Sequence, residues 1–212
     1  MPIIIAKTPR LVKRFFPMLR WSFSSSEKII YLTFDDGPTS EITEWTLQIL
    51  GKYHAKATFF CIGKNVEKYP NITEQIVTAG HRIANHCFNH DNAWKSDAET
   101  YLNSVEKTQY LLECFQKNNT KLFRPPYGKL TYKKVKKLRQ NNYQIIMWDV
   151  LSNDVQKKVS PKKSLQTLLK KTKNGSIVVF HDSIKGSATL KEVLPEFLKY
   201  FSELGYEFRG IE

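Results

Sequence analysis

The chain has 212 residues, 41% of them hydrophobic, and carries 33 Lys or Arg against 20 Asp or Glu, for a formal net charge of +13. This length favours a single domain, because one core can grow to roughly 250–300 residues before it divides, and the apolar content suffices for such a core. No apolar run of about 18 residues is present, which excludes a transmembrane helix, and three cysteines without a CxxC pair give no disulfide framework.

The N-terminal residues 1–27 are expected to form a basic and apolar arm ahead of a domain over 28–212. The short apolar start of the chain, over 2–6, precedes the basic residues, which is the wrong order for a signal peptide. Residues 8–21 mix large apolar with basic side chains and are interrupted at Pro17. They predict either a short helix lying in a membrane interface or an arm packed on the domain.

Short apolar runs alternate with longer segments of helical period after the arm. We expect strands near 29–34, 56–61, 81–85, 121–124, 143–148, 176–181 and 206–209. We expect helices near 41–53, 65–79, 97–117, 131–141, 162–172 and 189–204. This alternation predicts an α/β fold with about seven mostly parallel strands, arranged as an open sheet or as a closed barrel.

Reactive residue types follow five of the predicted strands. In chain order they are Asp35 and Asp36, His86 and His90, Arg124 and Tyr127, Asp149 and Asp154, and His181 and Asp182. Sites in parallel sheets and barrels are built at the carboxyl ends of strands. The pattern therefore predicts one assembled site.

The first two groups predict a metal centre. Asp35 and Asp36 are adjacent carboxylates before a Gly-Pro turn, and such crowding costs free energy unless a cation or a proton lies between them; a solvated turn is the alternative. His86 and His90 are four apart, which in a helical turn puts both imidazoles on one face, although surface histidines also occur at this spacing. Two imidazoles with Asp36 would leave a fourth metal position open. Asp35 would then be placed to take a proton from water.

Three later segments predict supporting roles around this centre. Arg124 is expected to pair with Asp35, the alternative being an ordinary surface arginine. Tyr127 follows two prolines that stiffen its loop, so its backbone N–H is placed to face an oxyanion. His181 ends an apolar strand and is either a core residue or, with its pKa raised by Asp154, a proton donor to a leaving amine.

Five motifs in this order resemble those of the polysaccharide deacetylases, carbohydrate esterase family four, with the chitooligosaccharide and peptidoglycan deacetylase homology domain. They are TFDDGP (33–38), HCFNH (86–90), RPPYG (124–128), SND (152–154) and VFHD (179–182). The resemblance covers roughly 28–210 and implies a single-domain distorted (β/α) barrel. It also implies a divalent metal, Zn²⁺ ahead of Co²⁺ or Ni²⁺, and hydrolysis of N-acetyl groups from an aminosugar with release of acetate.

The same resemblance implies a role for each motif residue. The implied catalytic residues are Asp35, His181, Arg124 and Asp154, the implied metal ligands are Asp36, His86 and His90, and the implied substrate-binding residues are Pro126 and Tyr127. Asp35 would be the general base, oriented by Arg124. His181 would be the general acid, tuned by Asp154, and the amide of Tyr127 would complete an oxyanion hole.

Four positions depart from the family pattern. Cys87 stands where Ser or Thr is usual, so that metal affinity is lowered or the thiol itself approaches the metal. Leu151 replaces a frequent Asp, Val155 a frequent Trp, and Val179 a usual Leu. The changes at Leu151 and Val155 remove a polar contact and an aromatic wall from the groove, which leaves the core chemistry intact and the substrate class open.

Three functions therefore stay open. The first is deacetylation of N-acetylglucosamine-containing polysaccharide or oligosaccharide, either peptidoglycan or chitin-like. The second is hydrolysis of another C–N bond in a small molecule. The third is non-catalytic binding of an anionic polymer or membrane surface, suggested by the net charge. Because the implied ligands, base and acid are all retained, we favour an enzyme.

The expected partner is an N-acetylated glycan, with peripheral contact to an anionic membrane or cell-wall polymer. No motif that reads nucleic acid accompanies the lysines, so no nucleic-acid partner is expected. We expect a cytoplasmic or peripherally membrane-associated protein by default, or one facing the cell wall if it is exported by an unrecognised route.

Overall fold

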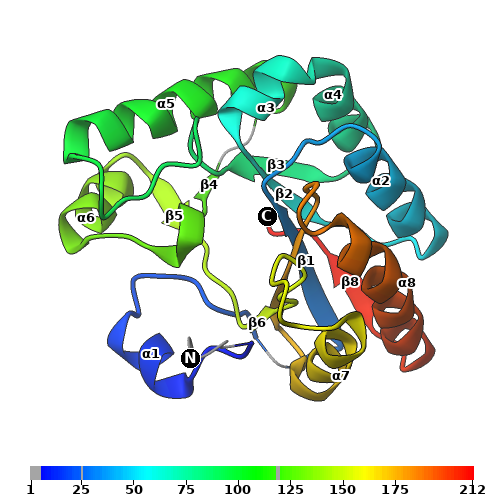
Figure 1. The fold of residues 1–212 in the computed structure, drawn as a ribbon. Helices are drawn as coiled ribbons and strands as arrows, with labels where there is room; N and C mark the ends of the chain where they lie inside the picture. Colours follow the sequence, from blue (N-terminus) through cyan, green and yellow to red (C-terminus); the bar gives the residue numbers. More distant parts are fainter. Residues whose placement is uncertain (1–5, 25, 118–119) are drawn as a thin grey trace.

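A curled sheet of parallel strands organises this computed structural model, which describes residues 6–24, 26–117 and 120–212 (Figure 1). The strands are β1 (Ile29–Asp35), β2 (Thr58–Cys61), β3 (Arg82–Asn85), β4 (Lys121–Phe123), β5 (Tyr143–Ile145), β6 (Val150–Leu151), β7 (Ile177–His181) and β8 (Glu207–Arg209). Their order in the sheet is β5-β4-β3-β2-β1-β7-β6, and β8 pairs with the first half of β1. The predicted α/β distorted barrel of about seven parallel strands is confirmed.

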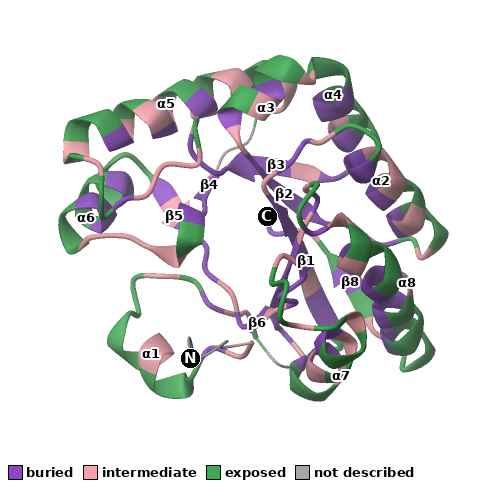
Figure 2. Cartoon of the chain, viewed as in Figure 1, coloured by how far each residue is buried: buried purple, intermediate pink, exposed green. Residues whose placement is uncertain are grey.

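Helices cover the outside of this sheet. They are α1 (Arg10–Phe15), α2 (Ile42–Lys52), α3 (Gly63–Lys68), α4 (Pro70–Thr78), α5 (Ala98–Phe115), α6 (Tyr132–Gln140), α7 (Pro161–Lys171) and α8 (Ser187–Glu203). Figure 2 shows that most of them turn buried residues towards the strands and exposed residues outwards. Among the described residues, no helix combines the length and the apolar character needed to cross a bilayer.

Two predicted elements differ from the structure. The single helix expected over 65–79 is two helices, because Pro70 disfavours helical geometry at Tyr69, which ends α3 and precedes α4 with φ −128° and ψ 58°. The strand expected over 143–148 ends at Ile145, and the chain pairs again only in β6. Between them, the carbonyls of Ile146 and Met147 accept hydrogen bonds from a buried arginine side chain.

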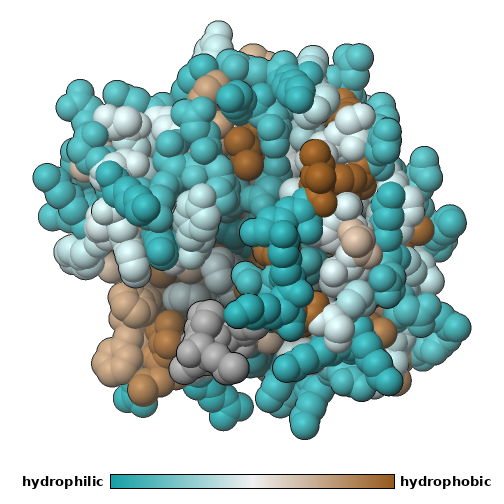
Figure 3. All heavy atoms as spheres, in the orientation of Figure 1, coloured by the Kyte–Doolittle hydropathy of each residue, from teal (hydrophilic) through white to brown (hydrophobic). Residues whose placement is uncertain are grey.

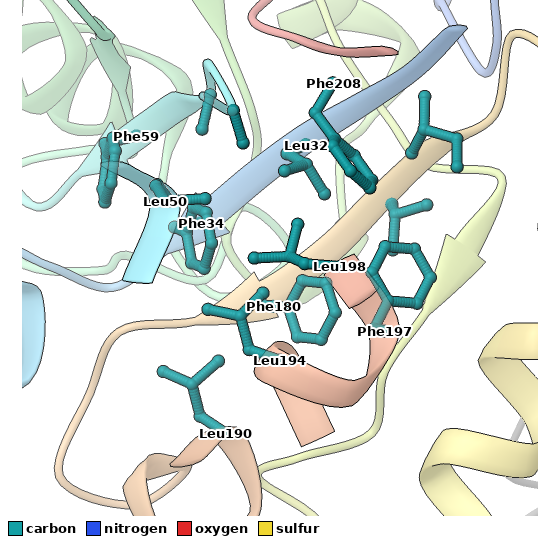
Figure 4. Close-up of a cluster of buried hydrophobic side chains, with 14 of the residues drawn as sticks. Leu32, Phe34, Leu50, Phe59, Phe180, Leu190, Leu194, Phe197, Leu198 and Phe208 are labelled. Carbon is teal, nitrogen blue, oxygen red and sulfur yellow. The ribbon is translucent and has the colours of Figure 1, made fainter. Parts of the chain in front are cut away.

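The main core lies between the sheet and α8. Phe34 of β1 and Phe180 of β7 have ring centroids 5.8 Å apart, and Phe180 meets Phe197 of α8 at 5.5 Å (Figure 4). Both strands have neighbours on each side and are covered on both faces, which explains their almost continuous apolar sequence. This rigid centre fixes where β1 and β7 end.

The N-terminal arm packs on the domain, which was one of its two expected arrangements. It fills the space between the edge strands β5 and β6 (Figure 1). Lys7 pairs with Val150, Arg20 with Ile146, and Ser22 with Ser176 as single β-bridges. The indole of Trp21 is buried among side chains of the domain.

A buried carboxylate anchors the arm. Asp149 accepts hydrogen bonds from Lys7 Nζ at 2.5 Å, from Ser176 Oγ at 2.6 Å and from Lys13 Nζ. These partners hold the pKa of Asp149 below its usual range, although burial alone would raise it. Asp149 lies at the amino end of β6, and it does not join the residues at the carboxyl ends of the strands.

We predict that Asp149→Ala lowers the free energy of unfolding by about 1–3 kcal/mol, because two partly buried lysines lose their carboxylate while retaining some access to water. Urea unfolding followed by circular dichroism measures the change. Glu67→Ala is the matched control, since the Glu67–Lys107 pair is exposed, and it should cost less than about 0.5 kcal/mol. Equal stability of the Asp149 variant and the natural chain would contradict the anchoring role.

Candidate active site

A cleft of about 310 Å³ opens at the carboxyl ends of the strands. The residues that line it are Asp35, Asp36, His86, His90, Pro125, Tyr127, Gly128, Trp148, Leu151, Val155, Gln156, Val179, His181 and Lys185. Asp35 ends β1 and lies in register with His181, which ends β7. The structure thus brings together the predicted aspartates and histidines from segments far apart in the sequence.

The end of β1 turns so that both neighbouring carboxylates face this cleft. Successive side chains along a strand point to opposite faces. Asp36 points to the same side as Asp35 because its backbone is left-handed, with φ 78°. Gly37 follows, and its N–H donates to Asp182 Oδ1 at 3.2 Å. A Cβ at Gly37 would lie 2.0 Å from Asp182 Oδ2, so only glycine permits this close approach.

Asp182 braces the turn from behind. It is fully buried and also accepts a hydrogen bond from Thr43 Oγ1 at 2.5 Å. Burial raises the pKa of its carboxyl to about 7, with smaller contributions from the charges of Asp36 and Asp35. The sequence placed Asp182 at a strand end but gave no sign of this supporting contact.

Asp36, His86 and His90 form the predicted cluster, with one ligand atom from each lying within 4.8 Å of the others. Asp36 Oδ1 is 3.6 Å from His86 Nε2 and 3.2 Å from His90 Nε2. Two imidazoles and a carboxylate are a donor set suited to Zn²⁺ and related divalent ions. In the described part of the chain, no other group of three such side chains converges in this way.

The loop that carries the two histidines is not helical, in contrast to the helical turn assumed from their spacing. Cys87 and His90 both take left-handed backbone conformations, with φ 61° and 58°. The side chain of Asn85 accepts a hydrogen bond from Cys87 N at 3.0 Å and so shapes the start of the loop. The imidazoles meet because of this irregular turn, with ring centroids 5.1 Å apart.

His86 is held in one tautomer. Its Nδ1 lies 2.7 Å from the carbonyl oxygen of Arg124, and because a carbonyl only accepts, Nδ1 carries the proton and Nε2 has a free lone pair. Burial lowers the pKa of His86 to about 4, against the opposing charges of Asp35 and Asp36. His86 is therefore neutral at pH 7, the state that metal ligation requires.

Asp35 is fixed by a fully buried arginine. Arg124 NH1 donates to Asp35 Oδ1 at 2.6 Å and to Thr33 Oγ1 at 2.8 Å. The same guanidinium lies 4.0 Å over the ring of Phe60. The predicted pairing is thus present, and Arg124 acts on the cleft through Asp35 because it does not line the cleft itself.

His181 and Asp154 form the second pair. Asp154 Oδ1 lies 2.7 Å from His181 Nδ1, and Oδ2 accepts from the backbone N–H of His181 at 2.8 Å. Burial would lower the pKa of His181, but Asp154, with help from Asp36 and Asp35, raises it to about 9. Because Nδ1 is hydrogen-bonded to Asp154, Nε2 is the ring nitrogen available for interaction with a molecule in the cleft.

Of the two loop residues predicted at the site, Tyr127 lines the cleft and Pro126 does not. Tyr127 lies at the cleft mouth in a left-handed conformation, φ 60°, with its ring 4.5 Å from that of His90. Pro126 does not line the cleft, whereas its neighbour Pro125 does, because Pro126 begins the short 3₁₀ turn Pro126–Gly128.

The positions that depart from the family pattern divide into two groups. Cys87 is buried in a core cluster with Tyr101 and takes no part in the ligand group, so the thiol does not approach the metal position. Leu151, Val155 and Val179 all line the cleft and make part of its wall apolar.

Three cleft residues were missed from the sequence. Trp148 was included in a predicted strand, and its place just before the SND motif is a signal that it reaches the site. Gln156 and Lys185 lie in irregular segments beyond the strand ends. Neither follows a periodic pattern that would have revealed it.

Comparison with known proteins extends the resemblance. The family model for polysaccharide deacetylase matches residues 24–146. Two curated peptidoglycan-N-acetylglucosamine deacetylases from Bacillus cereus are 35% and 34% identical to the chain over 172 and 194 residues. These matches cover 79% and 89% of this chain, and 62% and 88% of the respective relatives.

Solved structures share the fold. The Bc1960 peptidoglycan N-acetylglucosamine deacetylase superposes with a TM-score of 0.84 at 30% identity, covering 92% of this chain and 91% of that chain. BA3943 from Bacillus anthracis, described as a pseudoenzyme of carbohydrate esterase family four, gives 0.80 at 26% identity, covering 90% and 66%. Taken with the order of the motifs, these matches show that the chain belongs to the polysaccharide deacetylase family.

Proposed function

We propose that this protein is a metal-dependent deacetylase that removes N-acetyl groups from an N-acetylglucosamine-containing glycan and releases acetate. The observation that carries the proposal is the meeting of Asp36, His86 and His90 beside two buried charge pairs in one cleft. Peptidoglycan is the favoured glycan, because the similar curated relatives act on it by name. Membership of the family does not by itself establish catalytic activity, since the family includes a pseudoenzyme.

Asp36, His86 and His90 would hold the metal, with Zn²⁺ favoured by the two imidazoles. A divalent cation bound there would polarise the acetamide carbonyl and lower the pKa of a water molecule. The neutral state of His86 and the low pKa of Asp36 suit this role. Burial alone would raise the pKa of Asp36, but the hydrogen bond from His90 and the charge of His181 outweigh it.

Asp35 would act as the general base. It takes a proton from the water whose oxygen attacks the acetyl carbon, while Arg124 keeps the carboxylate in place. The attack leaves negative charge on the former carbonyl oxygen. The backbone N–H of Tyr127, held in its stiff loop, would stabilise that charge.

His181 would act as the general acid. Its protonated ring gives a proton to the nitrogen of the aminosugar as the C–N bond breaks, so that a neutral amine and acetate leave. Asp154 keeps the ring charged at neutral pH and fixes its orientation. The apolar side chains of Leu151, Val155 and Val179 offer a surface for the acetyl methyl group.

We predict that Asp35→Asn keeps the bound metal and lowers kcat by about 10²–10⁴-fold, because the variant loses the base but no ligand. Acetate release from N-acetylglucosamine oligomers measures turnover, and elemental analysis of the purified protein measures the metal. Normal turnover in this variant would rule out the role given to Asp35.

His86→Ala should lose metal and activity together, because it removes a ligand whose other ring nitrogen is also fixed. His54→Ala is the matched control: His54 is exposed and lies outside the cleft, so its replacement should change neither quantity. Full metal occupancy in the His86 variant would overturn the ligand assignment.

We predict that Asp154→Asn moves the alkaline limb of the kcat/KM profile to lower pH. His181 donates only while protonated, and its folded pKa of about 9 depends on the Asp154 charge, so activity disappears sooner as pH rises. The acidic limb should stay in place, and the deficit should shrink as pH falls. An unmoved alkaline limb would show that His181 is not the titrating acid.

A further inference from the structure

The exposed side of the arm carries large apolar side chains that no other part of the described chain, residues 6–24, 26–117 and 120–212, covers. In α1, Leu11 and Phe15 are 64% and 71% exposed, one helical turn apart on the same face. The opposite side of the helix, with Val12 and Lys13, packs towards the domain. Figure 3 shows tan and brown side chains gathered over α1. The packing of the arm between β5 and β6 therefore does not explain why Leu11 and Phe15 are apolar.

This apolar surface continues beyond α1. An apolar groove of about 260 Å³ lies beside it, and exposed Phe16, Met18, Trp94 and Tyr132 are among the residues that line it. We call Leu11, Phe15 and these four residues the arm-side surface. Contiguous exposed apolar patches of this kind mark sites of interaction with proteins, ligands or membranes.

Positive charge surrounds the arm-side surface. Arg10 and Arg14 are exposed on α1, Lys129 Nζ lies 4.7 Å over the ring of Trp94, and Lys136 and Arg139 line a hollow with Met18 and Tyr132. The sequence has no Asp or Glu over 6–24 or over 121–148, the two segments that supply most of this surface. Acidic residues near the surface come only from the segment around Trp94, with Asp91, Asp97 and Glu99, so basic side chains predominate.

We infer that the arm-side surface docks on an anionic lipid bilayer. Its apolar side chains would enter the boundary between headgroups and acyl chains, while the surrounding Arg and Lys side chains pair with lipid phosphates. A second copy of the chain fits less well, because it would bring two basic surfaces together. The groove shares Gly128 with the catalytic cleft, so docking holds that cleft beside the membrane.

Co-sedimentation with vesicles tests the inference. The full chain is mixed with phosphatidylcholine vesicles with and without phosphatidylglycerol. Two arm variants are compared, Leu11→Ser/Phe15→Ser and Arg10→Glu/Arg14→Glu. They change exposed side chains and keep the arm in place, because the arm pairs with the sheet. The matched controls on other surfaces are Tyr110→Ser/Tyr200→Ser and Lys191→Glu/Lys199→Glu, which change exposed residues of the same classes.

We expect the natural chain to bind the anionic vesicles, and each arm variant to bind at least about tenfold more weakly at unchanged thermal stability. The controls should bind like the natural chain, and acetate release from a soluble oligomer should be unchanged in every variant. No binding by the natural chain, equal binding to both vesicle types, or equal loss in the Lys191 control would overturn the inference. Self-association lost in the Leu11 variant without vesicle binding would assign the surface to a second copy.

Discussion

One buried guanidinium joins the separate parts of the site. Arg124 is fully buried, which would be costly for an unpaired charge, and its donors are used by Asp35, by Thr33 and by two backbone carbonyls. These contacts tie β1 to β4 and to the segment that follows β5. The carbonyl of the same residue fixes His86, so one position orients both the proposed base Asp35 and the proposed metal ligand His86. Any displacement of β4 would therefore disturb both groups at once.

The N-terminal arm occupies the gap between the two edge strands of the sheet. In the described residues, the edge strands β5 and β6 are not paired with each other, and the arm occupies the space between them. Its lysines neutralise Asp149, which precedes β6 and does not line the cleft. The arm thus has two sides with different roles: one supplies stability to the sheet, while the other is left exposed with apolar and basic side chains.

The sequence predicted the residues of the site better than the backbone that presents them. Asp36, His86 and His90 were expected to meet because carboxyl ends of parallel strands share one edge. The left-handed backbone at Cys87 and His90 was not predicted, because the four-residue spacing of the histidines also fits a helical turn. The break before Pro70 was readable from the chain, as proline restricts the residue before it. The role of Asp149 depends on lysines more than a hundred residues away, which no local pattern connects.

The two central histidines show how environment separates identical side chains. His86 is buried and His181 is partly buried, and burial by itself lowers the pKa of each. His86 donates Nδ1–H to a neutral carbonyl and reaches a pKa of about 4, whereas His181 meets the Asp154 carboxylate at Nδ1 and reaches about 9. A ring that is neutral at pH 7 offers a lone pair, and a ring that is charged offers a proton. The partner at Nδ1 therefore separates the two proposed roles, with His86 as a ligand for a cation and His181 as the donor of a proton to a leaving nitrogen.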